Sequence, residues 1–583
     1  MIVFDFEVFP TDWLVCFLDH NKQFNMICND RQELVKFYKT HEKEVWVGYN
    51  SLNYDKWILD AILNDKDPYK VSNSIIVERS HPMGICNVPA CHYDTMVRVG
   101  GAPIGLKMLE GQMGMDMTET PVPFGTANLT REQLEVIGGY CKQDVLATAG
   151  VLQATKGKFK TSLNLVNEFH LGYEWLSRTH AQITAKVLGA VPLHKSEYDA
   201  NKVRLSSLIQ LNDHYTPIYD FYKDMETSFD RSKSLIFDVA GVPHRYGSGG
   251  LHSARPNFHS SVSLDTTIKL GYLDVKSYYP SLMLKLKMLS RTVQYPTFQH
   301  IYDMRQQYVA DGKEDMAYSY KILINTVFGI SDDVYNPVYD PYNFNNVVVN
   351  GQLLITDLIC QLENNCDRFK LIQTNTDGII FEYDNEETVH DTCNEWGKRT
   401  FMNFKFKNLT DIWQKDVNNY LIRYTDGSTD GVGGLFKNED LNQQLIAVQN
   451  AVKNYLLCST PIEQSIHSET SLMNFQQIIK TPKNMDFCIA LTKGDPKILD
   501  TKYNRIFYAT DGYELRGGSN SQLCTSIFGT PTCSKLMNIS RADGTLRVVN
   551  SAVKDVPVPK WVDLNRYIKM AKELLPLYGC EAQ

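Results

Sequence analysis

Six acidic residues stand where they could hold divalent metal ions: Asp5, Glu7, Asp55, Asp144, Asp274 and Asp377. Carboxylate oxygens are ligands that Mg²⁺ prefers, and ions held in this way commonly assist the transfer or cleavage of phosphate esters. Asp274 is soon followed by a predicted helix start, whose free backbone N–H groups favour phosphate. The stretch around Asp274 therefore predicts a site for Mg²⁺ with a polyphosphate. A buried strand with one satisfied aspartate is the alternative.

Strands and turns must position most of these acids. Residues 271–275 are apolar around Asp274 and predict a buried strand, while Pro280 fits the first turn of the helix that follows. Asp5 and Glu7 would share one face of a strand and would repel each other unless a cation lies between them. Asp377 precedes a glycine between two apolar runs, which predicts a hairpin, and it could be no more than a turn residue.

Two predicted helices would present polar side chains in rows. Residues 130–133 form a capping-box opening, and the helix after it places Tyr140 and Asp144 on one face. Farther along, Lys321, Asn325 and Phe328 also share one face, and the other faces would bury Tyr320, Leu323, Ile324 and Val327. A cation, an amide and a ring in one row suit a nucleotide. A core helix with an extended lysine is the alternative.

The composition fits a soluble, multidomain protein. A chain of 583 residues with 43% hydrophobic and 22% charged residues is long enough for three or four domains. No apolar run approaches the ~18 residues of a membrane span, and no signal peptide is predicted, so we expect a cytoplasmic protein, in the host cytoplasm if it is viral. The net charge of −8 argues mildly against nucleic acid, but residues 151–210 are locally basic, so global charge does not decide the partner.

The cysteine content indicates a reducing compartment. Thirteen cysteines without regular spacing predict free thiols. The tightest cluster, His81, Cys86, Cys91 and His92, could ligate zinc, although its C-x₄-C spacing has no second pair and neutral packing explains it equally well.

Taken in chain order, Asp5-x-Glu7, Asn50-x₃-Tyr54-Asp55 and Tyr140-x₃-Asp144 resemble the three exonuclease motifs of the DnaQ-like proofreading domains of DNA polymerases. The resemblance implies an RNase H-like fold in which the four acids hold two divalent ions. It implies that Tyr140 orients the attacking water and that Asn50 and Tyr54 contact a frayed 3′ end. Lys107 would face the scissile phosphate, and Asp94 would be structural or accessory.

A second set of motifs resembles motifs A, B and C of family B DNA polymerases: Asp274-x₂-Ser277-x-Tyr279-Pro280, Lys321-x₃-Asn325-x₂-Phe328-Gly329 and Thr376-Asp377-Gly378. This resemblance implies that Asp274 and Asp377, with Val275 among the ligands, hold two Mg²⁺ (or Mn²⁺) ions for nucleotidyl transfer. The implied nucleotide-binding residues are Ser277, Tyr278, Tyr279, Arg305, Lys321, Asn325 and Phe328. Tyr279 stands where the family places the ring that excludes a ribose 2′-OH.

Several positions depart from the family pattern. Asn375 replaces the usual first acid of motif C. Tyr246, Gly249 and Gly250 resemble the Tyr-x-Gly-Gly linker that contacts template, with one extra residue. Tyr420 is the nearest candidate for the Lys-x-Tyr motif that contacts the primer strand. The short intervals between motifs A, B and C leave no room for the large insertions of protein-primed relatives.

These resemblances predict a multidomain chain of α/β and α+β type. We expect an RNase H-like exonuclease domain over 1–155, a connector and start of the palm over 156–260, and short helical fingers over 301–335. The palm, with an antiparallel sheet, would comprise 261–300 and 336–430, and the thumb 431–583, with helices at 440–457 and 562–575.

The predicted function is template-directed DNA polymerisation with 3′–5′ proofreading, for a phage or mobile-element genome. Expected partners are primer-template DNA, dNTPs and replication accessory proteins, and we expect a monomer without membrane contact. The alternatives are a protein-primed or self-priming replicase and a DNA-binding scaffold without catalysis.

Overall fold

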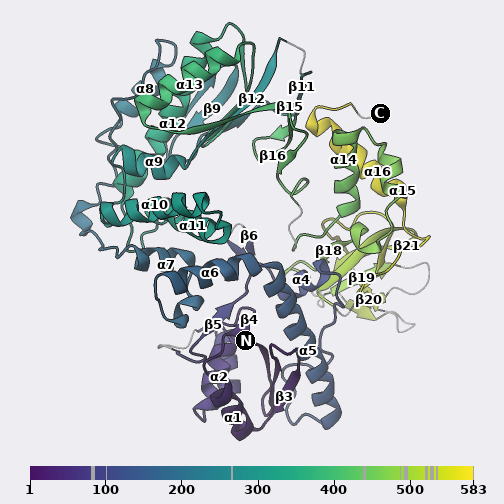
Figure 1. Ribbon diagram of the computed structural model, residues 1–583. Coiled ribbons are helices and arrows are strands. Elements are labelled where there is room, and N and C mark those ends of the chain that lie inside the picture. The colour runs from purple at the N-terminus through teal and green to yellow at the C-terminus, as the bar shows by residue number, and fades with distance from the viewer. Residues whose placement is uncertain are drawn as a thin grey trace. The chain divides into compact units, whose positions relative to one another are not determined.

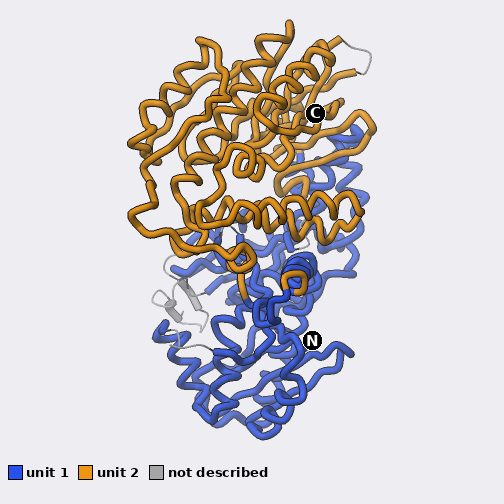
Figure 2. The backbone as a smooth tube through the Cα atoms, turned by 60° about the vertical axis from the view of Figure 1, so that its left-hand side comes forward, with its two compact units in different colours: residues 1–166, 170–177, 438–571 blue, residues 167–169, 178–437, 572–583 orange. Residues whose placement is uncertain are grey.

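The computed structural model has a mixed α/β architecture with several sheets, as predicted, and divides into two compact units (Figures 1 and 2). It describes residues 1–80, 86–99, 101–263, 267–437, 441–485, 487–491, 497–499, 501–518, 523–525, 531–533 and 536–581. Unit 1 comprises Met1–Val166, His170–Ser177 and Asn438–Ala571, and unit 2 comprises Asn167–Phe169, Arg178–Lys437 and Lys572–Gln583.

Unit 1 begins with a five-stranded sheet of order β3-β2-β1-β4-β5. Its strands are β1 (Ile2–Val8), β2 (Trp13–Leu18), β3 (Phe24–Cys28), β4 (Trp46–Gly48) and β5 (His92–Asp94). β1 is antiparallel to β2 and parallel to β4. Alternation along β1 sends Phe4 and Phe6 to one core cluster and Val3 to another, so Asp5 and Glu7 project on the side of Val3.

Helices supply the side chains that complete both clusters. α1 (Arg31–His41), α2 (Asp55–Leu63) and α3 (Pro68–Ile76) follow the strands that build the first cluster. α5 (Arg131–Ala154) covers the other face through Ile137, Cys141 and Val145. The predicted capping box of Thr130 and Gln133 is present. Gly138 explains how α5 lies so close, because a Cβ at this position would be 2.6 Å from the Met26 sulfur on β3.

The rest of unit 1 is built from the segment Asn438–Ala571, hereafter the C-terminal segment. It contains the helices α14 (Ile446–Cys458) and α15 (Ile462–His467) and the start of α16 (Leu564–Leu574). Its main sheet includes β18 (Gln477–Lys480), β19 (Phe487–Leu491), β20 (Lys497–Leu499), β21 (Tyr503–Gly518), β24 (Met537–Asn538) and β25 (Leu546–Val548). The helix predicted from residue 440 begins at Ile446.

Unit 2 is organised around an antiparallel sheet. Its strands follow the order β10 (His252–Ala254), β13 (Phe369–Asn375), β14 (Gly378–Tyr383), β12 (Lys269–Val275), β15 (Phe404–Asp416), β16 (Asn419–Tyr424) and β17 (Thr429–Val432), with β11 (Phe258–Ser261) pairing to β15. β12 is the predicted strand that ends near Asp274. β13 and β14 form the predicted hairpin, in which Asn375 pairs with Gly378.

The helices of unit 2 are α7 (His180–Val187), α8 (Thr216–Lys223), α9 (Tyr278–Lys285), α10 (Tyr295–Ala310), α11 (Glu314–Ile330), α12 (Pro341–Asn365) and α13 (Glu386–Thr400). Pro280 lies in the first turn of α9, as predicted. Among the residues that the structure describes, we find no helix whose length and apolar composition would let it cross a lipid bilayer. The cysteines whose side chains the structure describes are free thiols: Cys16, Cys28, Cys86, Cys91, Cys141, Cys360, Cys366, Cys393, Cys458, Cys488 and Cys580.

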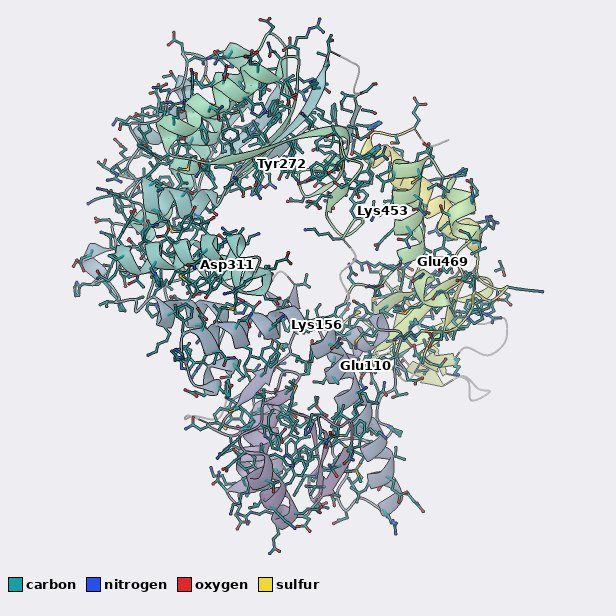
Figure 3. All side chains as sticks on the ribbon, in the orientation of Figure 1. Glu110, Lys156, Tyr272, Asp311, Lys453 and Glu469 are labelled. Atoms are coloured by element: carbon teal, nitrogen blue, oxygen red, sulfur yellow. The ribbon has the colours of Figure 1, made fainter. Side chains whose placement is uncertain are left out.

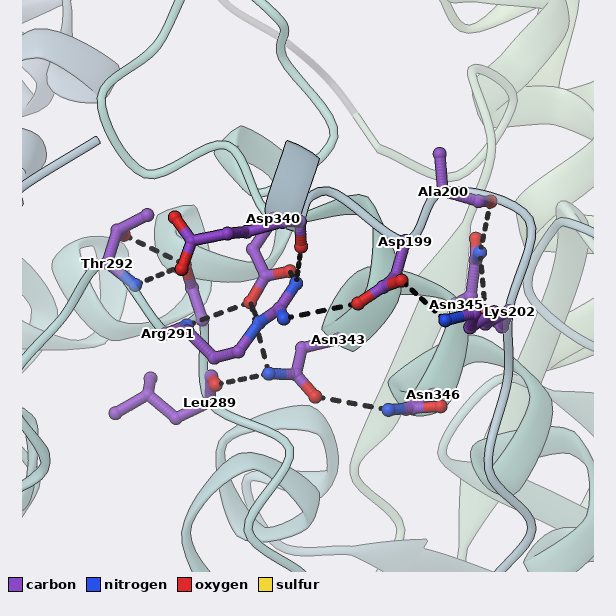
Figure 4. Close-up of polar contacts among 12 residues, drawn as sticks. Asp199, Ala200, Lys202, Leu289, Arg291, Thr292, Asp340, Asn343, Asn345 and Asn346 are labelled. Atoms are coloured by element: carbon purple, nitrogen blue, oxygen red, sulfur yellow. Dashed lines mark hydrogen bonds and ion pairs between the residues drawn. The ribbon is translucent and has the colours of Figure 1, made fainter. Parts of the chain in front are cut away.

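α12 is buried along most of its length although it carries many asparagines. Their amide groups bind the backbone of the extended segment 199–210. Asn346 Oδ1 accepts the Arg204 N–H at 2.7 Å, and Asn350 Oδ1 accepts the Ser206 N–H at 2.7 Å. Asn345 Nδ2 donates to the Ala200 carbonyl at 2.9 Å (Figure 4). These backbone groups of 199–210 thus pair with side chains instead of a neighbouring strand.

An ion pair lies at the start of α12, where Asp340 is the residue before the helix. Asp340 is 0% exposed, and its carboxylate accepts the Arg291 backbone N–H at 2.8 Å as well as Arg291 Nε at 3.0 Å and Nη2 at 2.7 Å (Figure 4). Asn343 Nδ2 donates a further bond to Asp340 at 3.1 Å. Arg291 therefore neutralises a carboxylate that water does not reach.

We expect Arg291→Ala to lower the free energy of unfolding by about 3 kcal/mol, because it leaves the Asp340 charge buried and unpaired. Denaturant unfolding measures this change. The control is Lys202→Ala, which removes an exposed partner of Asp199 and should change stability little. Equal losses in the two variants would contradict the assignment.

Candidate active sites

Four acids converge in unit 1 from three elements. Asp5 and Glu7 lie on β1, Asp55 is the first residue of α2, and Asp144 lies on α5. Asp55 Oδ1 accepts the Phe6 N–H at 3.1 Å, which fastens the start of α2 to β1. Cys141 Sγ donates to the Asp5 carbonyl at 3.3 Å, which fastens α5 to the same strand. The structure therefore brings together the four acids that the sequence predicts for one site.

Burial and mutual repulsion raise the pKa values in this cluster. Burial raises the pKa of Asp5 far above its usual value, and Asp55, Asp144 and Glu7 raise it further. Burial, then Asp144 and Asp55, do the same for Glu7. The pKa of Asp55 rises to about 7, with burial as the largest cause. The ionised forms are therefore unfavourable together unless a cation joins them.

The donor set fits such a cation. One ligating atom from each of Asp5, Glu7 and Cys141 lies within 4.8 Å of the others, and this is the one group of its kind among the described residues. Two of the three are carboxylates, the ligand that Mg²⁺ and Mn²⁺ prefer, while the Cys141 thiol donates to Asp5 and its pKa is raised by burial. Cys141 escaped the sequence analysis because its place on the inner face of α5 is set by tertiary packing.

Lys107 and a fifth acid, Glu110, complete the cluster. Lys107 on α4 (Leu106–Gln112) contacts Asp144 Oδ1, lies 3.0 Å from Glu110 Oε1, and stands 4.3 Å from the centre of the Tyr140 ring. Burial acts to lower the pKa of Lys107, but Asp144 and Glu110 raise it by more. Burial also raises the pKa of Glu110 to about 9. The place of Glu110 is labelled in Figure 3. Glu110 was not predicted, and its spacing of three from Lys107 is the signal that could have revealed it.

The loop after β4 places Asn50 and Tyr54 beside this cluster. The Asn50 and Leu52 N–H groups each donate to the Asp94 carboxylate at 2.9 Å, so Asp94 shapes the loop. The Tyr54 hydroxyl bonds to Ser72 Oγ at 2.9 Å, and its ring packs against the first core cluster. A contact of Asn50 and Tyr54 with DNA stays a prediction.

The proposed zinc ligands do not converge among the described residues. His92 is buried and bonds to Ser51 Oγ at 2.8 Å, and burial lowers its pKa to about 3. Cys86 Sγ donates to the Val88 carbonyl at 3.4 Å. His81 lies outside the described residues. Neutral packing accounts for His92 and Cys86.

In unit 2, two acids meet on neighbouring strands. Asp274 on β12 pairs across the sheet with Gly378, the residue after Asp377, and the Val275 N–H donates to the Asp377 carbonyl at 2.7 Å. The pKa of Asp377 is raised to about 6, first by burial and then by the neighbouring Asp274. Burial also raises the pKa of Asp274, while Lys405 and Lys321 act to lower it. Tyr272, two residues before Asp274, is labelled in Figure 3.

The two acids line a cavity of about 710 Å³. The cavity is lined by Asp274, Val275, Lys276, Ser277, Tyr278, Tyr279, Pro280, Tyr302, Arg305, Gln306, Val309, Lys321, Asn325, Phe328, Thr376, Asp377, Asn403 and Lys405. Every nucleotide-binding and metal-binding residue predicted for this site is therefore among its walls. Two carboxylates face several cations here, an arrangement suited to a metal ion with an anionic ligand.

Arg305 and Ser277 form one side of the cavity. Arg305 Nη1 on α10 donates to Ser277 Oγ at 2.7 Å, while Arg305 Nε is buried with no hydrogen-bond partner among the described residues. Ser277 precedes α9 with φ at 49°, the left-handed region, so the first N–H groups of the helix follow it directly. An unsatisfied guanidinium nitrogen beside a helix start suits a phosphate oxygen.

The opposite wall carries the predicted helix row. Lys321 and Asn325 are exposed on one face of α11, while Tyr320, Leu323, Ile324 and Val327 are buried, as predicted. The Phe328 ring lies 4.2 Å, centre to centre, from the Tyr279 ring. These two rings form an aromatic floor next to the acids.

Two predicted DNA contacts are wrong for their side chains. Tyr246 is 0% exposed and bonds through its hydroxyl to Thr356 Oγ1 at 2.7 Å, because α12 covers that face of β9 (Val242–Tyr246). Tyr420 is buried in a core cluster of the sheet. The Tyr278 side chain is also buried and bonds to the Gly351 carbonyl at 2.7 Å, which leaves only its backbone for a ligand.

The two linker glycines behave differently. A Cβ on Gly250 would lie 2.7 Å from Thr376 Oγ1, so glycine allows this backbone to approach the loop that carries Asp377. Gly249 has open space around its Cβ position. Their contact with DNA stays a prediction.

Lys405 is a cavity residue that the sequence analysis missed. It lies on β15 directly across from Asp274, and the neighbouring Asn403 carbonyl accepts the Lys276 N–H at 2.7 Å. The start of β15 therefore flanks residues 275–277. No local pattern could have revealed Lys405, because only the pairing of distant strands places it there.

Comparison with known proteins finds no related sequence: no family model and no curated protein matches the chain. Among solved structures, the chain is similar to the family B DNA polymerase from the hyperthermophilic archaeon Pyrobaculum calidifontis, at 12% identity and a TM-score of 0.42. That match covers 100% of this chain and 78% of the other. A likeness at this level carries no argument about activity.

Without divalent ions, the first cluster is expected to make the protein less stable as pH rises. Asp5, Glu7 and Asp55 hold protons more tightly in the folded chain than in the unfolded chain, because their folded pKa values are raised. The unfolded chain releases them from about pH 4, so the free energy of unfolding falls from there through the Asp55 pKa of about 7. Thermal melting in chelator at pH 5 and pH 7.5 measures the fall.

The matched control is Asp5→Asn, which removes one charge without changing the side-chain shape. It should show a smaller loss of melting temperature between the two pH values than the wild type. An identical pH dependence in both proteins would rule out the acid cluster as the cause.

Proposed function

We propose that this chain is a template-directed DNA polymerase that also trims DNA from the 3′ end. The observation that carries the proposal is the cavity of unit 2. It has a volume of about 710 Å³, and its lining includes Asp274, Asp377, Arg305 and Lys321. Nucleotidyl transfer from a triphosphate needs groups of these kinds: two acids, several basic side chains and aromatic rings that can contact the nucleotide. The motif resemblances support the same reaction.

In the extension site, this chain's residues would bind and orient the nucleotide. The triphosphate would be bound by Arg305, Lys321 and Asn325 and by the N–H groups at the start of α9. The Tyr279 and Phe328 rings would contact the sugar and base, with Tyr279 leaving no room for a 2′-OH. Asp274, Asp377 and Val275 would hold two Mg²⁺ or Mn²⁺ ions, which when bound would favour ionisation of the primer 3′-OH and stabilise the developing charge on phosphate.

In the trimming site, Asp5, Glu7, Asp55 and Asp144 would hold two more ions of the same kind. Tyr140 would position the attacking water, and Lys107 would stabilise charge on the scissile phosphate. Asn50 and Tyr54 would hold the frayed strand, since a ring offers a stacking surface to any base.

The proposal assigns the predicted regions as follows: trimming to 1–155, palm to 261–300 and 336–430, and fingers to 301–335. Partners would be primer-template DNA and dNTPs, for replication of a phage or mobile-element genome.

A labelled primer-template with Mg²⁺, with and without dNTPs, tests the proposal. Wild type should extend the primer with dNTPs and shorten it without them. Asp274→Ala should lose extension and keep shortening, and Asp5→Ala should do the reverse, because the two acids lie in different units. Loss of both activities in both variants, or of neither, would contradict two separate sites.

Lys405 provides a second test, because it flanks the loop that would hold the triphosphate. Lys405→Ala should raise the KM for dNTP about three- to fivefold, as expected for one partly screened charge pair. The KM for primer-template should stay unchanged, which separates nucleotide phosphate from DNA phosphate. Steady-state kinetics at fixed salt measures both.

The control is Lys407→Ala on the same strand, whose ammonium lies 4.2 Å from the Tyr424 ring centre. It should leave the KM for dNTP close to the wild-type value. Equal effects of the two variants would indicate general surface charge instead of a phosphate contact.

A further inference from the structure

The helix α4 supplies the cation that meets the trimming acids. Lys107, its second residue, contacts Asp144 Oδ1 and lies 3.0 Å from Glu110 Oε1. Glu110 is 0% exposed, and its Oε2 has no hydrogen-bond partner among the described residues. Lys107 is thus held between two buried acids, and its position depends on where α4 lies.

Both ends of α4 rest on β21 of the C-terminal segment. At the N-terminal end, a Cβ on Gly105 would lie 2.8 Å from the Tyr503 hydroxyl. At the other end, Arg505 Nη2 donates to the Gly111 carbonyl at 3.0 Å and to the Met115 carbonyl at 2.7 Å. Tyr503 and Arg505 are two residues apart on one strand, so one face of β21 supports the whole helix.

Arg505 is a buried cation whose bonds go to neutral acceptors. Its side chain is 0% exposed, and it also donates to the Ser551 carbonyl at 2.6 Å and to Gln476 Oε1 at 2.8 Å. Gln476 in turn donates to the Gln112 carbonyl at 3.1 Å. A buried guanidinium is costly unless its donors are satisfied, so these carbonyls must stay where they are.

A structural role for Arg505 in packing the C-terminal segment is the plain alternative. The contacts favour more than that, because α4 is only seven residues long. Lys107 lies one turn from Gly111, and a displacement of that carbonyl would be carried along the helix to the ammonium.

We propose that Arg505 is a positioning residue for the trimming site: by fixing the end of α4, it keeps Lys107 on Asp144. The C-terminal segment is then a working part of that site, although Arg505 lies 394 residues after Gly111 in the chain. The inference rests on the proposed trimming function.

A double-mutant cycle separates positioning from packing. Arg505→Gln should lower kcat for trimming about tenfold in the wild-type background and less than about twofold in Lys107→Ala, because the residue acts through Lys107. KM for the DNA should change little. Equal losses in both backgrounds would overturn the proposal, and melting curves confirm that each variant is folded.

Gly105→Ala perturbs the other end of α4 without removing a buried charge. Its extended backbone accepts alanine, so the expected loss of trimming comes from the clash with the Tyr503 hydroxyl. Adding Tyr503→Phe removes that oxygen and should restore trimming to within about twofold of Tyr503→Phe alone. Gly125→Ala, at a position with open space, is the control. Failure of Tyr503→Phe to rescue would argue against support by β21.

Ion binding gives a readout that does not depend on trimming. In an Asp377→Ala background, Lys107→Ala and Arg505→Gln should each tighten Mn²⁺ binding about threefold, measured by paramagnetic resonance, because an ammonium no longer competes for Asp144. The double variant should gain nothing further. Additive gains would overturn the positioning role, whereas a wild type that binds Mn²⁺ but does not trim would refute only the proposed function.

Discussion

Repulsion between neighbouring buried carboxylates governs both sites, because each ionised group raises the energy of the next. Unit 1 buries Asp5, Glu7 and Asp55 together, and burial and then repulsion by neighbouring acids raise the pKa of each of the three. Lys107 is the cation in contact with the fourth acid, Asp144. Unit 2 leaves Asp274 and Asp377 on the wall of an open cavity and places Lys321 and Lys405 within electrostatic reach. The first site therefore depends more strongly on a bound ion to become fully charged than the second.

Local sequence patterns correctly predicted the features of the sites that depend only on local structure. Alternation in β1 placed Asp5 and Glu7 on one face, the helical spacing placed Lys321 and Asn325 in a row, and the Asp-Gly turn placed Asp377 at a hairpin tip. Burial by distant elements was beyond such patterns. Tyr246 looked available to DNA, but α12 covers it, and Lys405 and Arg505 acquire their places from strand pairing and packing between distant parts of the chain. Glu110, by contrast, could have been predicted from its spacing of three residues from Lys107.

Unit 1 is assembled from the two ends of the chain (Figure 2). The Met117 N–H donates to the Asn550 carbonyl at 2.7 Å, and the Val553 N–H donates to the Gly114 carbonyl at 2.9 Å, so short segments near residues 115 and 550 bind each other directly. Closing a loop of this length costs chain entropy that only cooperative packing can offset. During synthesis, α4 would remain without its support until the C-terminal segment has emerged, so the acid cluster beside α4 would be completed late.

The asparagines of α12 bind main-chain N–H and carbonyl groups of residues 199–210, and these bonds do not involve the side chains there. Evolution is accordingly free to exchange nearly any residue within that extended stretch, provided its length is kept, whereas each asparagine facing it is locked in place by the amide geometry. Two regions of one chain that bind each other should thus diverge at very different rates, the helix slowly and the extended segment 199–210 rapidly.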